Sequence, residues 1–156
     1  MNTAASMQNP LVTKLSRFAP LSEKDRGILD ALCANPERFD AAATVVREDE
    51  VPRRGFVLTR GMACRYRTLP DGRRQILTFL LPGDFFDLHV FLLQQSTYSI
   101  GTLTPTRLAA IERNTVIDIV ANHPRLGAAL SDCVDARGGA RRYDGRGRAG
   151  IRRKPR

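Results

Sequence analysis

The alternation of apolar and polar residues predicts a β-hairpin near the middle of the chain. Residues 62–68 read MACRYRT, where arginines alternate with Cys64 and Tyr66 at the period of two typical of a strand. Pro70-Asp71-Gly72 then supplies a turn, because proline presets φ, aspartate bonds nearby backbone and glycine adopts positive φ. Residues 74–81 return as the second strand. We expect the arginines of the first strand on the face opposite Cys64.

Helical spacing appears on both sides of this hairpin. Residues 20–36 read PLSEKDRGILDALCANP, where Ser22 is a natural N-cap, the apolar residues fall on one side and Pro36 ends the helix. Residues 112–130 show helical spacing again, broken before Pro124, which can open a further helix.

Four more short strands are predicted from runs rich in β-branched residues. Residues 41–61 contain two of them, joined by a charged loop, and residues 96–111 contain the other two. A helix, many short strands with glycine turns and a final helix indicate a mainly β fold with flanking helices, a β-roll.

A phenylalanine-rich stretch around Pro82-Gly83-Asp84 predicts a segment that wraps a pocket. We expect Asp84 to bond the backbone of this turn rather than to act as an acid or base with Asp87. Four phenylalanines are candidates to line a cavity, although most are expected in the core: Phe79, Phe85, Phe86 and Phe91.

Composition narrows the class of protein. The 156 residues suggest one domain, and no apolar run reaches the roughly 18 residues that cross a bilayer. The N-terminus lacks a basic start followed by an apolar stretch, so we expect a cytoplasmic protein with no membrane partner. The net charge is +9, of which residues 131–156 carry +6.

Catalytic and metal chemistry find little support in the sequence. There is no nucleophile–base set, no Gly-rich phosphate loop and no Cys or His cluster, so we expect neither an enzyme nor a cofactor. Cys64 is a candidate oxidant sensor, but a buried inert thiol is the favoured interpretation. His89 is a candidate ligand or pH sensor, with a packed, hydrogen-bonded side chain favoured, and His123 is expected to be structural or solvent-facing.

Three segments in this order resemble the sensory half of Crp/Fnr-type bacterial transcriptional regulators: PLSEKDRGILDAL, GMACRYRTLPDGRRQILTFLLPGDFFDLHVFLL and TPTRLAAIERNTVIDIVANHPRL. The resemblance covers residues 9–130 and implies a cyclic-nucleotide-binding-like double-stranded β-helix, or jelly roll. It also implies a long dimerising helix and a DNA-reading winged helix-turn-helix, hence an unknown small-molecule effector, a homodimer and DNA as partners.

The same resemblance locates the ligand pocket. In nucleotide-binding members a Gly-Glu pair contacts the ribose and an Arg-Ser pair meets the phosphate; these positions fall here on Asp87-Leu88 and Tyr98-Ser99. Leucine cannot accept a hydrogen bond and tyrosine brings no positive charge, so ordinary cyclic-AMP binding is not expected. The pocket candidates are Phe86, Asp87, Leu88, His89, Tyr98 and Ser99.

Residues 131–156 do not fit the family pattern. They are rich in glycine and arginine, and a winged helix-turn-helix of on the order of 60 residues is missing. One interpretation is a disordered basic arm that contacts nucleic-acid phosphates without sequence preference. The other, which we favour, is a reading frame that slipped near Leu130. Candidates for non-specific contacts are Arg141, Arg142, Arg146, Arg148, Arg152, Arg153 and Lys154.

The sequence therefore predicts an effector-sensing domain of a Crp/Fnr-type regulator over residues 9–130, followed by a basic tail and lacking its DNA-reading module. The alternative is a free-standing small-molecule sensor domain whose basic tail binds nucleic acid non-specifically.

Overall fold

Two four-stranded antiparallel sheets form the body of the molecule. The computed structural model describes residues 8–86 and 96–138. One sheet has the strand order β1-β8-β3-β6 and the other β2-β7-β4-β5. The strands are β1 (Glu37–Phe39), β2 (Thr44–Val46), β3 (Arg54–Arg60), β4 (Ala63–Thr68), β5 (Arg74–Leu80), β6 (Phe85–Phe86), β7 (Ser99–Thr102) and β8 (Thr106–Glu112). This arrangement confirms the predicted mainly β jelly roll with flanking helices.

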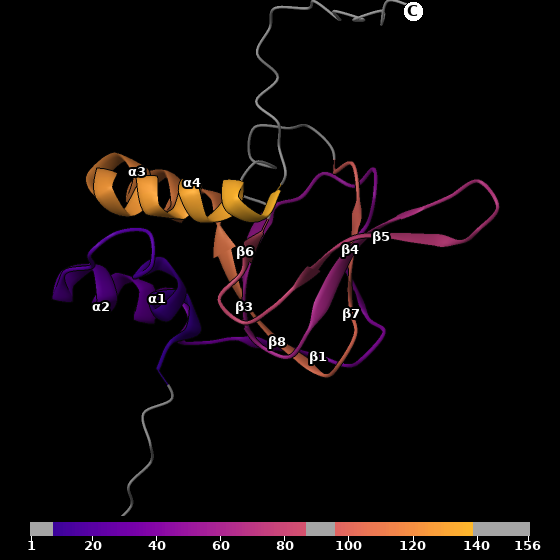
Figure 1. Ribbon diagram of the computed structural model, residues 1–156, viewed down its shortest axis with the longest axis horizontal. Helices are drawn as coiled ribbons and strands as arrows, with labels where there is room; N and C mark the ends of the chain where they lie inside the picture. The colour runs from indigo at the N-terminus through magenta and orange to yellow at the C-terminus, as the bar shows by residue number, and fades with distance from the viewer. Residues whose placement is uncertain (1–7, 87–95, 139–156) are drawn as a thin grey trace, which may run out of the picture.

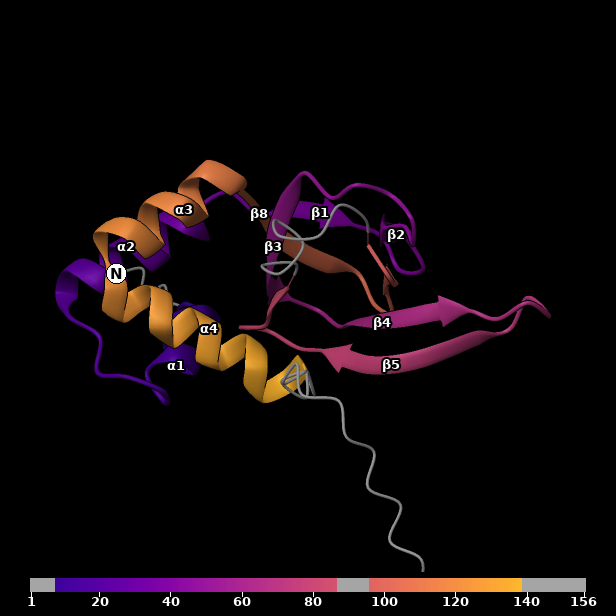
Figure 2. The ribbon, with the colours of Figure 1, turned by 90° about the horizontal axis from the view of Figure 1, so that it is seen from above.

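Four helices gather on one side of the two sheets (Figures 1 and 2). They are α1 (Pro10–Leu15), α2 (Glu23–Leu32), α3 (Arg113–Asn122) and α4 (Pro124–Gly138). α3 and α4 are separated where predicted, immediately before Pro124, which opens α4. α4 continues eight residues beyond the expected boundary at Leu130, and Cys133 in that extension is buried. Residues 139–156, with their basic candidates, lie outside the described residues.

The predicted hairpin is confirmed as β4 and β5, which project from the body (Figures 1 and 2). Gly72 adopts φ +84°, and its N–H donates to the carbonyl of Leu69 at 2.9 Å. The Asp71 carboxylate accepts from the N–H of Arg73 at 3.0 Å, as expected of an aspartate in a turn.

A second turn, residues 81–84, ties the sheets to α1. Gly83 has φ +90°, and a Cβ there would lie 2.6 Å from the carbonyl oxygen of Pro10, so only glycine fits. Asp84 Oδ2 accepts from the N–H of Leu81 at 2.7 Å, which confirms its predicted role in the turn. The same carboxylate forms an ion pair with Lys14 of α1.

The hydrophobic core has two parts. One lies between the helices and the neighbouring sheet, and it includes Leu11, Leu15, Leu29, Val57, Leu126 and Leu130. The other lies between the two sheets, and it includes Val46, Phe56, Leu58, Leu80, Phe86 and Ile100. The first part explains why the helices stay on one side, because each contributes buried apolar residues to it.

α2 begins with the expected N-cap. The Ser22 hydroxyl accepts from the Asp25 N–H at 3.1 Å, and the Asp25 carboxylate accepts from the Ser22 N–H at 2.9 Å, a complete capping box. These bonds lower the pKa of Asp25 below its ordinary value of 3.8. The ionised carboxylate therefore contributes fully to the stability of α2 at pH values above 3.8. This contribution is lost as the pH falls through the lowered pKa.

We expect Ser22→Ala to lower the free energy of unfolding by about 1 kcal/mol, because it leaves an N-terminal N–H of α2 without its cap. Urea unfolding followed by circular dichroism would measure the loss. Ser22→Asp is the control, since aspartate caps equally well and should keep the wild-type midpoint. Equal losses in both variants would mean that the serine acts through something other than capping.

Helix α1, which Asn9 caps, was not predicted. The Asn9 side chain accepts from the N–H of Leu11 at 3.0 Å, and Pro10 occupies the first helical position. The same side chain donates to the carbonyl of Leu29 at 3.0 Å, which joins α1 to α2. Within residues 8–86 and 96–138, no helix is long and apolar enough to span a bilayer.

Candidate functional site

Several predicted pocket residues lie outside the part of the chain that the structure describes. These are Asp87, Leu88 and His89, together with Phe91, all within residues 87–95. Phe86, Tyr98 and Ser99 flank that segment and are described. The site is therefore built from β6 in one sheet and from β7 with its neighbour β4 in the other.

Phe86 belongs to the core between the sheets. Its side chain is fully buried, and its ring stacks on Phe56 with centroids 5.6 Å apart. Phe85 is also buried, whereas Phe79 on β5 is half exposed and lies outside both core clusters. The expectation that most of the phenylalanines pack in the core is met by Phe85 and Phe86, but not by Phe79.

Tyr98 and Arg65 meet on the inner side of the β2-β7-β4-β5 sheet. Arg65 pairs in register with Ile100, whose side chain is in the core between the sheets. Its guanidinium carbon lies 4.8 Å from the centre of the Tyr98 ring, which packs against the same core. A cation–π contact of this kind holds the guanidinium plane in place. A positive charge therefore points into the roll from β4.

Ser99 contacts a different part of the chain from Tyr98. It pairs in register with Tyr66 rather than Arg65, and successive residues of a strand point to opposite faces. Its hydroxyl accepts from the backbone N–H of Glu48 at 2.9 Å. The structure thus brings Tyr98 to Arg65 and directs Ser99 toward the chain that follows β2.

The cysteines in the described part of the chain are poorly placed for reaction. Cys64 and Cys133 are buried, and Cys33 is half-buried. Burial raises the pKa of the Cys64 thiol, and it raises the pKa of Cys33 to about 11. A thiol must be exposed and ionised to react readily, so the buried, inert interpretation of Cys64 is supported. Within the described residues, no group of three or more His, Cys, Asp or Glu side chains is arranged to hold a metal ion.

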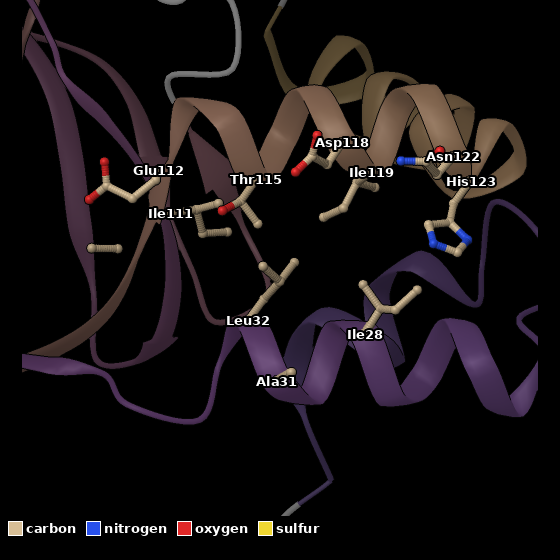
Figure 3. Close-up of a pocket in the computed structure, with 11 residues that line it drawn as sticks. Ile28, Ala31, Leu32, Ile111, Glu112, Thr115, Asp118, Ile119, Asn122 and His123 are labelled. Carbon is tan, nitrogen blue, oxygen red and sulfur yellow. The ribbon is translucent and has the colours of Figure 1, made fainter.

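An open groove of about 500 Å³ lies between α2, α3 and the end of β8 (Figure 3). Ile28 and Leu32 of α2 point across it toward Ile119 of α3 (Figure 3). Of the eleven residues that line it, Glu112 and Asp118 are acidic and none is Lys or Arg. The groove is therefore unsuited to an anion. His123 lies at its end as the C-cap of α3 and is partly exposed, in line with the expected structural role.

Positive charge also gathers on the outer face of the β1-β8-β3-β6 sheet. Arg107 of β8 pairs in register with Arg38 of β1 and with Arg60 of β3. All three are exposed and line a cleft of about 470 Å³. Water screens these exposed charges more than it screens Arg65, which is only partly exposed.

The alternation along the strand places Arg65 on the face opposite Cys64 but indicates no role for it. The signal was present in the alternation, because Arg65 lies two residues after Ala63 and therefore points to the same, inward face of β4. Which face would be inward depends on the packing of Leu80 and Ile100, which a single strand does not specify.

Comparison with known proteins agrees with this architecture. A family model for the cyclic nucleotide-binding domain matches residues 36–123. The chain is 31% identical over 108 residues to the transcriptional activatory protein AadR of Rhodopseudomonas palustris, covering 64% of this chain and 44% of that protein. It is 30% identical over 96 residues to a CRP-like cAMP-activated global transcriptional regulator of Mycobacterium tuberculosis, covering 61% and 43%. The chain thus spans less than half the length of these curated relatives.

Solved structures show the same fold. The sensor domain of the transcriptional regulator DNR from Pseudomonas aeruginosa matches with a TM-score of 0.62 and 21% identity, covering 86% of this chain and 93% of that one. The catabolite activator protein of Thermus thermophilus matches with a TM-score of 0.63 and 18% identity, covering 81% and 57%. This chain belongs to the cyclic nucleotide-binding domain family, in the form found in the N-terminal part of Crp/Fnr-type regulators.

Proposed function

We propose that this chain is the effector-sensing domain of a Crp/Fnr-type transcriptional regulator whose effector is not cyclic AMP bound in the usual way. The observation that carries the second part is Tyr98, which stands where nucleotide-binding members place the arginine that meets the cyclic phosphate. The guanidinium carbon of Arg65 lies 4.8 Å from the centre of the Tyr98 ring. A tyrosine hydroxyl offers one neutral donor, whereas an arginine offers a charged, two-pronged one.

The mechanism we propose is a population shift. An effector bound inside the roll would favour one arrangement of the helices that follow it, and so would bias the position of a DNA-reading module. The packing supports this route, because α4 shares a core with α1 and with Phe85 of β6, next to the roll interior. Specific DNA binding would belong to a separate module outside the described residues 8–86 and 96–138.

A homodimer is part of this proposal. β5 exposes Ile76 and Leu77, each about half accessible to solvent, and α3 exposes Ile117 and Val120. Exposed apolar side chains that form a contiguous patch often mark contact surfaces. Sedimentation of the purified chain would give its oligomeric state.

Calorimetric titration of the full chain with cyclic AMP tests the ligand part of the proposal. We expect no saturable heat, because the ribose and phosphate contacts of nucleotide-binding members are not matched at Leu88 and Tyr98. The same preparation should rise in melting temperature with one class of cellular metabolite, since a ligand that binds only the folded state stabilises it. Tight, saturable cyclic-AMP binding would contradict the proposal.

Gel shifts with two unrelated DNA duplexes separate this proposal from a chain that binds nucleic acid through its tail. Binding lost equally for both duplexes as salt rises would indicate phosphate contacts alone. The nucleotide sequence after codon 130 offers a second test. A helix-turn-helix encoded there in another frame would identify residues 131–156 as a slipped reading of a longer regulator.

A further inference from the structure

Arg65 carries a buried nitrogen that has no hydrogen-bond partner. Its Nε is shielded from solvent and bonds to no atom within residues 8–86 and 96–138. A desolvated donor without a partner destabilises the folded state, and more so when it belongs to a charged group. An apolar side chain of the same length would avoid this cost, so the position calls for a reason beyond packing.

The register of β4 places the Arg65 side chain on the inner face of its sheet, opposite Ile100. Its strand neighbours are Ile100 and Thr78, and its guanidinium carbon lies 4.8 Å from the centre of the Tyr98 ring. Stacking uses the flat face of this group, whereas its N–H donors lie in its plane. A cation–π contact is not a hydrogen bond, so the contact with Tyr98 leaves the Nε–H of Arg65 without an acceptor.

Within residues 8–86 and 96–138, no carboxylate pairs with Arg65. Glu48, which lies near β7, accepts instead from the Nε of Arg67 at 3.3 Å. Arg67 is exposed on the same strand, so Glu48 pairs with this exposed arginine and not with Arg65.

We propose that Arg65 is the anion-recognition residue of the effector site, and that the effector is a small molecule bearing a carboxylate or phosphate group. The guanidinium would donate two parallel N–H bonds to that oxyanion, with Tyr98 holding it in position. This inference rests on the proposed function, since it names the ligand class of the same interior. It places the recognising charge on β4 rather than at position 98.

Calorimetric titration with inorganic phosphate and with succinate, at constant ionic strength, tests the proposal on the full chain. We expect saturable binding of at least one probe to the wild type; the two probes distinguish a phosphate-bearing from a carboxylate-bearing effector. Arg65→Met should weaken that binding roughly tenfold to a hundredfold, the factor expected for losing hydrogen bonds to a charged group. Arg65→Lys should recover only part of it, because lysine lacks the planar fork.

Two matched variants control for charge. Arg74 also stacks on a tyrosine, with its guanidinium carbon 4.4 Å from the Tyr66 ring centre, but it is exposed. Arg107 belongs to the arginine group on the outer sheet. Arg74→Met and Arg107→Met should both keep wild-type affinity. Binding lost in Arg107→Met and retained in Arg65→Met would overturn the proposal in favour of the outer cleft.

The melting temperature without any anion gives a second readout. Arg65→Met should raise it, because the variant removes the unpartnered buried donor, and the gain should disappear when wild type is saturated with the anion. A lowered melting temperature together with unchanged anion affinity would show that Arg65 only packs on Tyr98, which overturns the proposal.

Failure of this inference is distinguishable from failure of the proposed function. If neither phosphate nor succinate binds, the anion assignment is wrong, while a shift by an uncharged metabolite would still support an effector domain. If no metabolite of any charge shifts the melting temperature, the sensing function itself is wrong.

Discussion

Asp84→Ala is expected to lower the free energy of unfolding by about 3–5 kcal/mol, one of the two largest losses that we expect from a single substitution. The Asp84 side chain is 3% exposed and Lys14 is 14% exposed, so the ion pair between them is largely removed from water. Deleting the carboxylate leaves the lysine charge in a desolvated place and also removes the acceptor for the Leu81 N–H. Urea unfolding followed by circular dichroism would measure the difference.

The double variant Lys14→Met with Asp84→Asn should recover most of that loss. It removes both charges together, and the asparagine oxygen can still accept from the Leu81 N–H. Asp71→Ala is the matched control, because Asp71 is also a turn aspartate paired with a basic residue but is exposed. Its removal should change the unfolding midpoint only slightly, since water screens that pair.

A small effect of Asp84→Ala, similar to that of Asp71→Ala, would mean that the pair with Lys14 contributes little to stability. The turn at residues 81–84 would then be held mainly by Gly83, whose N–H donates to the Leu58 carbonyl at 2.8 Å.

Local chemistry explains which elements the sequence predicts well. The β4–β5 hairpin is specified by Pro70-Asp71-Gly72, and α2 by its Ser22 cap, because each signal acts over a few neighbouring residues. The short strand β1 and helix α1 carry weaker local signals and were not predicted. β1 is fixed by pairing with β8, with Glu37 opposite Leu108 in register. Such pairing depends on residues distant in the sequence.

The remaining differences have tertiary causes. Glycine and charge after Leu130 indicated the end of a helix, yet α4 continues to Gly138, with Cys133 buried in the core that includes Leu15 of α1. The candidate site also depends on tertiary packing that the local sequence does not specify. The resemblance identified Tyr98 as a changed position, but only the packed sheets bring Arg65 to its ring.

Phe86→Ala should also cost about 3–5 kcal/mol, because it removes a fully buried ring from between the sheets and leaves a cavity beside Phe56. Phe79→Ala is the matched control on β5. Phe79 is 51% exposed, and substitutions at such positions usually change stability by less than about 0.5 kcal/mol. Urea denaturation of both variants beside the wild type would measure the difference.

Comparing the stabilities of Phe86→Ala and Phe79→Ala decides whether Phe86 belongs to the core or lines a ligand cavity. A core residue loses its packing in the absence of any ligand, so the full cost should appear in the purified chain. A cavity-lining residue would instead show a small loss without ligand and a large loss of ligand stabilisation, because its neighbours would already face solvent. The stacked Phe56 ring and the absence of exposed area on Phe86 favour the first result. Equal, small costs for Phe86→Ala and Phe79→Ala would contradict it and would return Phe86 to the effector site.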